Sequence, residues 1–423
     1  MEPESPVTAQ QQCVPRHRWV SRWLLFVLLV LLILLSAGVW WMGLQGRIEI
    51  PAGVTSDEQQ RARQDFRRVQ QRDPDDVELL LVLAENLARR GRTELAVECA
   101  ERIPVQDERC GLRSRLLLAQ YCLRLNRAFR AERAVRELLA VAGATVGETV
   151  GETAGGSERA AALAQVRTAR ELLVFLLSLQ FRFEERQAVL RELRQGGLLE
   201  PLLTKQLYFP SLLAWRTPQQ NERLLQFLKE SPEDVRLLAA HGRYLLGAGA
   251  VEEARRLLDG AVGLSPGDVG VLSAALECRF EEQDLAGFRD LLGVCPEYSE
   301  GEPWLLTQMR AEAAALRGDW SGSAVYFELL LAADETNPLY CQGLARACGQ
   351  LGQQDRRLQL QQRALQLAEL RLTLGEAELK NPGALRAASE SARALGLAAA
   401  AEDLEQLAQA GERAVRSGQE RQP

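Results

Sequence analysis

Histidine is almost absent from this chain, and the motifs of the common nucleophilic and metal-dependent enzymes are missing. The 423 residues include two histidines, His17 and His241, so a nucleophilic triad in the folded part would depend on His241 alone. No H-E-x-x-H or G-x-x-x-x-G-K-[ST] motif occurs. The helical pattern around His241 predicts a core or partly buried helix residue. We therefore expect no enzyme activity, no catalytic residue and no cofactor.

Metal-type cysteine spacing and disulfide-type cysteine patterns are also missing. Seven of the eight cysteines follow residue 45, and no C-x-x-C pair is present. An odd number at irregular spacing defines no disulfide framework, which leaves their oxidation state open. We expect small buried apolar side chains and no metal site. The seven positions are Cys99, Cys110, Cys122, Cys278, Cys295, Cys341 and Cys348.

A strong charge of one sign is missing as well. The chain has 51 basic and 57 acidic residues, a formal charge of −6 and a pI near 5.4. Such a balance gives no electrostatic basis for binding a phosphate backbone, so nucleic acid is not the expected partner. With 47% apolar and 26% charged residues, most of the chain is predicted to fold around a core.

One apolar run stands out from this average composition. Residues 24–44 are 21 consecutive uncharged residues, which as a helix would rise about 31 Å and match a bilayer core. Tryptophans flank both ends of the run, where indole rings favour the water boundary. We therefore predict a transmembrane helix over 23–45. Two alternatives are a buried helix and a signal peptide, the latter because arginines precede the run and small residues occur at 36–38.

The orientation of this span follows from the short tail before it. Basic residues occur near both ends of the span, so the local charge rule alone barely decides between the two orientations. A short basic tail tends to stay inside, whereas long domains cross regardless of charge. The expected location is a cell membrane, single-pass, with the C-terminal domain extracytoplasmic (periplasmic). The alternative places that domain in the cytoplasm.

A regular spacing of helix-ending residues organises the rest of the chain. Gly249, Gln283, Gly318 and Gly352 follow one another at intervals of 34, 35 and 34 residues within strongly helical sequence. Glycine at such a position can adopt the left-handed conformation that ends a helix. A period in this range predicts a solenoid of helix pairs, in which each pair buries its apolar face against its neighbours.

The unit that begins at Val235 carries the clearest pattern. It has small residues at Gly242 and Ala254, where two helices would cross, and closes at Pro266. This pattern resembles the tetratricopeptide repeat (TPR) family. The resemblance implies an all-α fold in which the transmembrane helix predicted from the apolar run is followed by a right-handed α-solenoid of TPR-like helix pairs. It covers residues 75 to 370.

The pattern divides the chain into segments with different expected structures. Repeats that fit it alternate with stretches that fit it poorly, and 143–157 is a Gly/Thr/Glu-rich stretch expected to be a mobile insertion. The predicted segments are a basic tail (1–22), the span (23–45), a linker and lead-in helix (46–74), repeats (75–142), the insertion (143–157), degenerate helical repeats (158–234), repeats (235–371), capping helices (372–416) and a disordered tail (417–423).

The resemblance also implies a concave groove, lined by the first helix of each unit, that binds segments of partner proteins. Arginines at such positions favour acidic partners through charge-assisted hydrogen bonds. The implied groove residues are Arg113, Gln120, Arg124, Arg236, Arg243 and Leu246.

We therefore expect a membrane-anchored scaffold or adaptor that acts in the assembly or secretion of an envelope or membrane complex. The alternative is a structural membrane protein that self-associates into homo-oligomers without a dedicated peptide ligand.

Overall fold

The computed structural model describes residues 64, 76–148, 156–210, 218–377 and 381–419. Within these ranges every regular element of appreciable length is an α-helix, and no β-strand occurs, as the sequence predicts. No helix in the described part is long and apolar enough to cross a bilayer. The predicted span over 23–45 lies outside the described residues.

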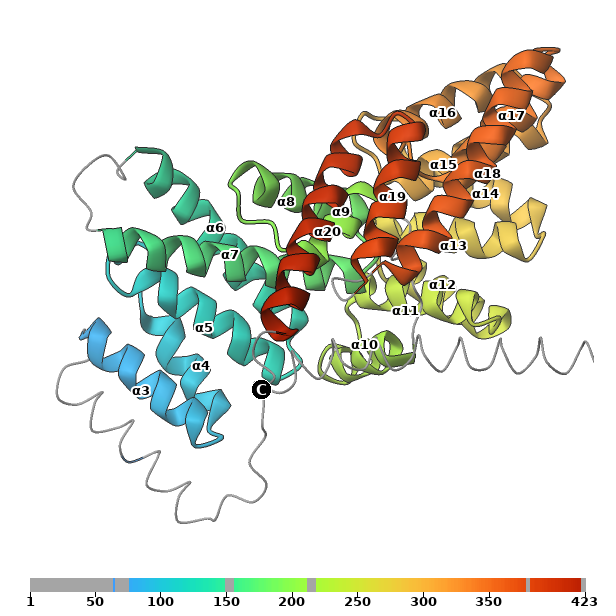
Figure 1. Cartoon of the computed structure of the whole chain (residues 1–423). Coiled ribbons are helices and arrows are strands. Elements are labelled where there is room, and N and C mark those ends of the chain that lie inside the picture. Colours follow the sequence, from blue (N-terminus) through green and yellow to red (C-terminus); the bar gives the residue numbers. More distant parts are fainter. Residues whose placement is uncertain (1–63, 65–75, 149–155, 211–217, 378–380, 420–423) are drawn as a thin grey trace, which may run out of the picture.

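Sixteen of the described helices form pairs that follow one another in chain order (Figure 1). Two further helices, α9 (Pro201–Tyr208) and α10 (Pro218–Glu230), lie between the third and fourth pairs. The pairs are α3 (Val77–Arg89) with α4 (Thr93–Arg102), α5 (Gly111–Arg124) with α6 (Ala128–Glu148), α7 (Gly156–Leu179) with α8 (Phe183–Gln195), α11 (Val235–Gly247) with α12 (Val251–Leu264), α13 (Val269–Glu281) with α14 (Leu285–Val294), α15 (Trp304–Leu316) with α16 (Trp320–Ala333), α17 (Pro338–Gln350) with α18 (Gln354–Glu376), and α19 (Pro382–Ala394) with α20 (Ala398–Gln419).

Each pair is joined by a tight turn with one residue in the left-handed region. At Gly249, where φ is +80°, the backbone N–H donates to the carbonyl of Leu246, and the N–H of Ala250 donates to that of Leu245. These two bonds satisfy carbonyls that the end of a helix leaves unpaired. The four turn residues expected from the sequence periodicity all have positive φ, so this prediction is confirmed. The eight turn residues are Gly91, Asn126, Phe181, Gly249, Gln283, Gly318, Gly352 and Gly396.

Small residues lie where the two helices of a pair cross, as the repeat pattern predicts. A β-carbon added at Gly242 would lie 2.5 Å from Cγ of Leu258, which shows how closely α11 and α12 approach. Ala254 on α12 is fully buried. A close approach also occurs between neighbouring pairs, where the ring of Phe327 on α16 occupies the space of a β-carbon at Gly343 on α17. The helix-pair packing therefore depends on these residues having little or no side chain.

The cysteines are buried and unpaired in the described part of the chain. Six of the seven have 4% or less of their surface exposed, and Cys295 is half-buried. Burial raises the pKa of Cys99 to about 12 and that of Cys122 to about 11. These thiols are therefore protonated at neutral pH and pack as small apolar side chains, as the sequence suggests.

Two segment boundaries differ from those expected. Helix α6 continues to Glu148, and α7 begins at Gly156, so the predicted insertion over 143–157 includes helical residues at both ends. Only 149–155 within it lie outside the described residues. At the C-terminus, α19 and α20 form another helix pair, with its left-handed turn at Gly396.

A pair of glycine substitutions tests the helix-crossing contact. We expect Gly242→Ala to lower the free energy of unfolding by about 2 kcal/mol, because the new methyl group collides with Leu258. Gly260→Ala is the matched control on α12, since nothing lies within 4 Å of its added β-carbon. The control should raise stability by about 1 kcal/mol through helix propensity. Urea unfolding followed by circular dichroism measures both changes, and shifts of the same sign would contradict this packing.

Candidate protein-binding surface on the first helices

The six predicted groove residues all lie on first helices of pairs, three on α5 and three on α11. Their environments differ strongly. Arg124 and Arg236 are exposed and Gln120 is half-buried, whereas Leu246 retains 8% of its surface and packs in an apolar cluster with Ala254. Leu246 is therefore a core residue and not a groove contact. Its position in the repeat predicted the helix but not the direction of its side chain.

Ion pairs link the first helices of neighbouring pairs and neutralise two of the four expected groove arginines. Arg113 binds Glu85 of α3 at 2.5 Å, with half of its own side chain exposed. The same kind of contact joins α11 to α13 and α15 to α17, and in these two ion pairs the residues are 34 positions apart. The three ion pairs are Glu85–Arg113, Arg243–Glu277 and Glu312–Arg346.

Arg243 is held inside the protein by two contacts. Its Nε donates to Oε2 of Glu277 at 2.6 Å, and its guanidinium lies 4.9 Å from the ring centroid of Phe181. Only 15% of each charged side chain in the Arg243–Glu277 pair is exposed. The expectation that Arg243 faces a free groove is therefore wrong, because the turn between α7 and α8 covers it.

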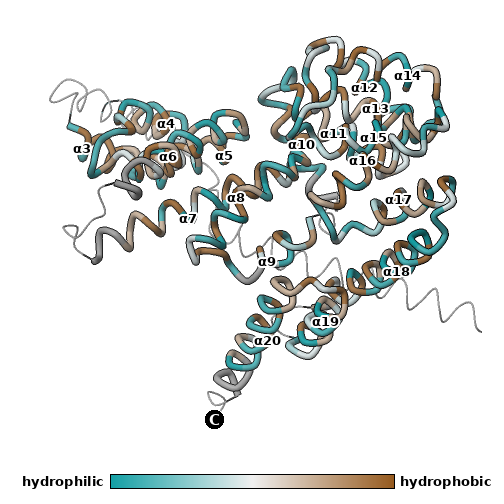
Figure 2. The backbone as a smooth tube through the Cα atoms, turned by 90° about the horizontal axis from the view of Figure 1, so that it is seen from above, coloured by the Kyte–Doolittle hydropathy of each residue, from teal (hydrophilic) through white to brown (hydrophobic). Residues whose placement is uncertain are grey.

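The segment that follows this turn passes among the C-terminal pairs (Figure 2). The Glu184 carboxylate accepts a hydrogen bond at 2.5 Å from the backbone N–H of Trp304, where α15 begins. Burial by the surrounding helices raises the pKa of Glu184. Further along, Lys205 Nζ donates to the carbonyl of Leu374 at the end of α18. Helices α8 and α9 thus contact the start of α15 and the end of α18, both of which come much later in the sequence.

The last residues of this segment complete the same set of contacts. The Tyr208 hydroxyl donates to Asp403 of α20 at 2.6 Å, and Phe209, with 1% of its surface exposed, packs in the apolar core of α18 to α20. The fully buried Arg186 donates to the carbonyl of Pro210 at 2.9 Å and lies over the Phe183 ring. We call residues 181–209 the internal segment. It occupies space between the C-terminal pairs that the sequence prediction left for a partner.

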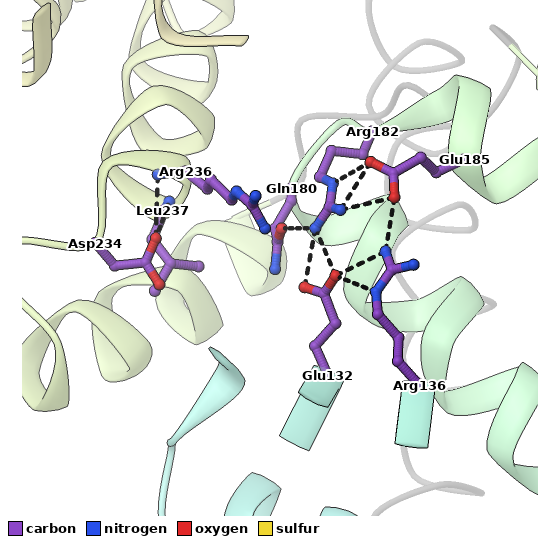
Figure 3. A network of polar contacts seen from close by, with 8 residues as sticks. All are labelled: Glu132, Arg136, Gln180, Arg182, Glu185, Asp234, Arg236 and Leu237. Atoms are coloured by element: carbon purple, nitrogen blue, oxygen red, sulfur yellow. Dashed lines mark hydrogen bonds and ion pairs between the residues drawn. The ribbon is translucent and has the colours of Figure 1, made fainter. Parts of the chain in front are cut away.

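Figure 3 shows the polar network that fixes the start of the internal segment. Arg182 donates to both carboxylate oxygens of Glu132 on α6, at 2.8 and 2.9 Å, and pairs with Glu185. Arg136 of α6 binds Glu132 and Glu185 as well. Burial opposes ionisation of Glu185, but its hydrogen bonds with the two arginines lower its pKa overall. The network joins the second pair to the third.

Arg236 lies beside this network without joining it. Asp234 caps the start of α11 by accepting from the backbone N–H groups of Arg236 and Leu237. The Arg236 side chain is exposed and extends toward Gln180 (Figure 3). Its guanidinium has no hydrogen bond or ion pair with any residue that the structure describes. Arg236 is thus the one predicted groove residue of α11 that stays open to solvent.

The first helices of the N-terminal pairs have a more open surface. Gln120 and Arg124 of α5 are accessible, and the Arg124 guanidinium lies 5.8 Å from the Tyr121 ring. Together with Arg113 they lie on α5 at spacings of seven and four residues, which places Arg113, Gln120 and Arg124 on one face of the helix. We call these three residues the α5 face. It presents cationic and amide donors suited to carboxylate groups.

Among the residues that the structure describes, no cluster of three or more potential metal ligands occurs. His241 is half-buried, and burial lowers its pKa. Its placement agrees with the prediction of a partly buried helix residue.

Substitution of Phe209 tests whether the internal segment supports the C-terminal pairs. We expect Phe209→Ala to destabilise these pairs by about 4 kcal/mol, because it removes a fully buried ring. The exposed Phe129 provides the control, and Phe129→Ala should change stability by no more than about 0.5 kcal/mol. Hydrogen exchange measured by mass spectrometry should show faster exchange in α18 to α20 for Phe209→Ala alone. Equal protection in both variants would refute this role.

Substitution of two arginines on α11 compares the partly buried, ion-paired Arg243 with the exposed Arg236. Arg243→Ala removes the contacts with Glu277 and Phe181 and should lower the free energy of unfolding by about 2 kcal/mol. Arg236→Ala should leave stability within about 0.5 kcal/mol of the wild type. Chemical denaturation of the two variants measures the difference. If Arg236→Ala were the more destabilising change, this assignment would fail.

Comparisons with known proteins give only distant likenesses. No family model and no curated protein matches the chain. Matching solved structures include MamA MSR-1 C2 (17% identity, TM-score 0.29, 40% of this chain and 97% of that chain) and the APC/C hetero-tetramer Cut9–Hcn1 (13%, 0.35, 78% and 66%). A tetratricopeptide repeat protein from Parabacteroides merdae also matches (13%, 0.30, 64% and 98%). Identities and TM-scores this low carry no argument about what the chain binds.

Proposed function

We propose that this protein is a membrane-anchored helical-repeat scaffold that binds partner proteins through its N-terminal pairs. The observation that carries the proposal is the contrast between the two halves of the array. On the C-terminal side, α8 and α9 pack against α15, α18 and α20, and the turn before α8 covers Arg243 of α11. On the N-terminal side, the α5 face remains open. A partner that binds Arg124 therefore does not compete with α8 or α9.

The chemistry of the α5 face suits an acidic segment of a partner. The Arg124 guanidinium has no ion pair with a residue that the structure describes, and it can accept a carboxylate in a bidentate arrangement. Gln120 offers amide donors one helical turn before it. Arg113 already pairs with Glu85, so it contributes less free charge. We therefore place the main electrostatic contact at Arg124.

Membrane attachment is the second part of the proposal and derives from the uncharged run at 24–44. One span would hold the array at the bilayer and raise its effective concentration near membrane partners. The short basic tail favours an extracytoplasmic array, with the cytoplasmic orientation as the alternative. We propose a role in assembling or exporting an envelope or membrane complex, without enzyme activity of its own.

Charge reversal at Arg124 tests the binding surface. We expect Arg124→Glu to reduce recovery of an acidic partner about tenfold, because a charge-assisted hydrogen bond is replaced by repulsion. Arg133→Glu is the control, since Arg133 lies on α6, the second helix of its pair, with 72% of its side chain exposed. Crosslinking in intact membranes followed by quantitative mass spectrometry measures recovery. Equal recovery with both variants, at unchanged helicity, would contradict the assignment of this surface.

A further inference from the structure

Helix α18 carries a row of exposed leucines on its outer side. Leu358, Leu365 and Leu372 follow one another every seven residues, and 56%, 71% and 76% of their surfaces are exposed. A seven-residue spacing places them along one side of the helix, about 10.5 Å apart. Scattered surface leucines are ordinary, but three in register on one helix form a continuous apolar stripe. We call these three residues the leucine stripe.

The opposite side of α18 already has its partners within the chain. Ala364, Leu367, Leu370 and Leu374 have at most 2% of their surfaces exposed and pack in the core that includes α19 and α20. Arg356 and Arg363, nearer to this side, pair with Glu328 of α16 and with Glu335. Helix α18 therefore has two apolar sides, of which the fold covers one. Helices with apolar residues on two sides usually pack against other helices on both sides.

We propose that the leucine stripe is a homodimer seam in which α18 pairs antiparallel with α18 of a second copy. The stripe is self-complementary about a two-fold axis at Leu365. In that arrangement Leu365 meets Leu365 of the second copy, and each Leu358 meets a Leu372. An interface of this kind presents the same patch on both subunits, as a closed dimer requires.

The polar residues beside the stripe favour this occupant and this direction. Gln361, Gln362, Ala368 and Glu369 are exposed on α18. Gln362 and Glu369 lie on the same side of the stripe, and antiparallel pairing brings Gln362 beside Glu369 of the second copy, where the amide can donate to the carboxylate, whereas parallel pairing opposes two Glu369 carboxylates. A lipid surface would instead favour lysines and arginines beside the leucines. The seam is independent of the α5 face, so either assignment can fail without the other.

Oligomeric state tests the seam in the full-length protein in detergent. Multi-angle light scattering should show a dimer for the wild type and a monomer for Leu365→Arg, because the two-fold axis brings two arginines together. We expect the dimer dissociation constant to rise at least about 100-fold. Leu264→Arg is the control, since Leu264 is 56% exposed on α12 and outside the stripe. A monomeric wild type, or a Leu365→Arg protein that stays dimeric, would overturn the proposal.

Crosslinking in native membranes tests the direction with milder substitutions. Leu365→Cys should form an intermolecular disulfide under oxidation, because residue 365 faces its own copy. Leu358→Cys should not, since the two substituted positions would lie about 21 Å apart along the antiparallel helices. The wild type controls for the native cysteines. Disulfides at both positions would overturn the antiparallel seam, as would crosslinks from residue 365 only to a different polypeptide.

Discussion

Packing of the internal segment inside the C-terminal pairs is the constraint on which the rest of this structure depends. Residues 181–209 contact α11, α15, α18 and α20 through the Phe181 ring, the Glu184 carboxylate, the Lys205 ammonium group and the Tyr208 hydroxyl. These contacts bury charged and aromatic side chains that would otherwise line an open groove. A solenoid normally leaves that surface to partners. Here the chain uses it as a second core, which leaves the N-terminal first helices as the accessible surface.

Arg243 and Glu277 on the covered first helices pair with each other, whereas Arg124 on the open α5 face has no ion pair among the described residues. Arg243 and Glu277 lose most of their contact with water and pair in the partly buried space beside Phe181. Breaking such a pair leaves a desolvated charge, so both residues hold the first helices in register. Arg124 stays in water, where a guanidinium costs little to keep unpaired. Arg124 therefore keeps its charge available for recognition.

The sequence predicted the local geometry well, because that geometry depends on neighbouring residues. The left-handed turns at Gly249, Gln283, Gly318 and Gly352 recur with the repeat period, and small residues at the helix crossings follow from contacts within one pair. The partners of Arg243 were not predictable in this way. Phe181 lies in a unit that fits the repeat pattern poorly, and contacts between distant units leave no periodic signal. The signal that could indicate such a contact is the presence of two aromatic residues, Phe181 and Phe183, at the turn between α7 and α8.

The degenerate unit and the leucine stripe illustrate opposite departures from the repeat pattern. In the degenerate unit, Arg186 of α8 and Phe209, which directly follows α9, are buried completely or nearly so. In α18, Leu358, Leu365 and Leu372 depart from the polar outer surface that a solenoid helix needs, and the fold leaves them exposed. Aligned leucines in water carry an unfavourable hydration free energy that burial against a second helix would remove. Because the stripe and the α5 face lie on different helices, a dimer joined through α18 would keep both α5 faces accessible and present two binding surfaces at the same membrane.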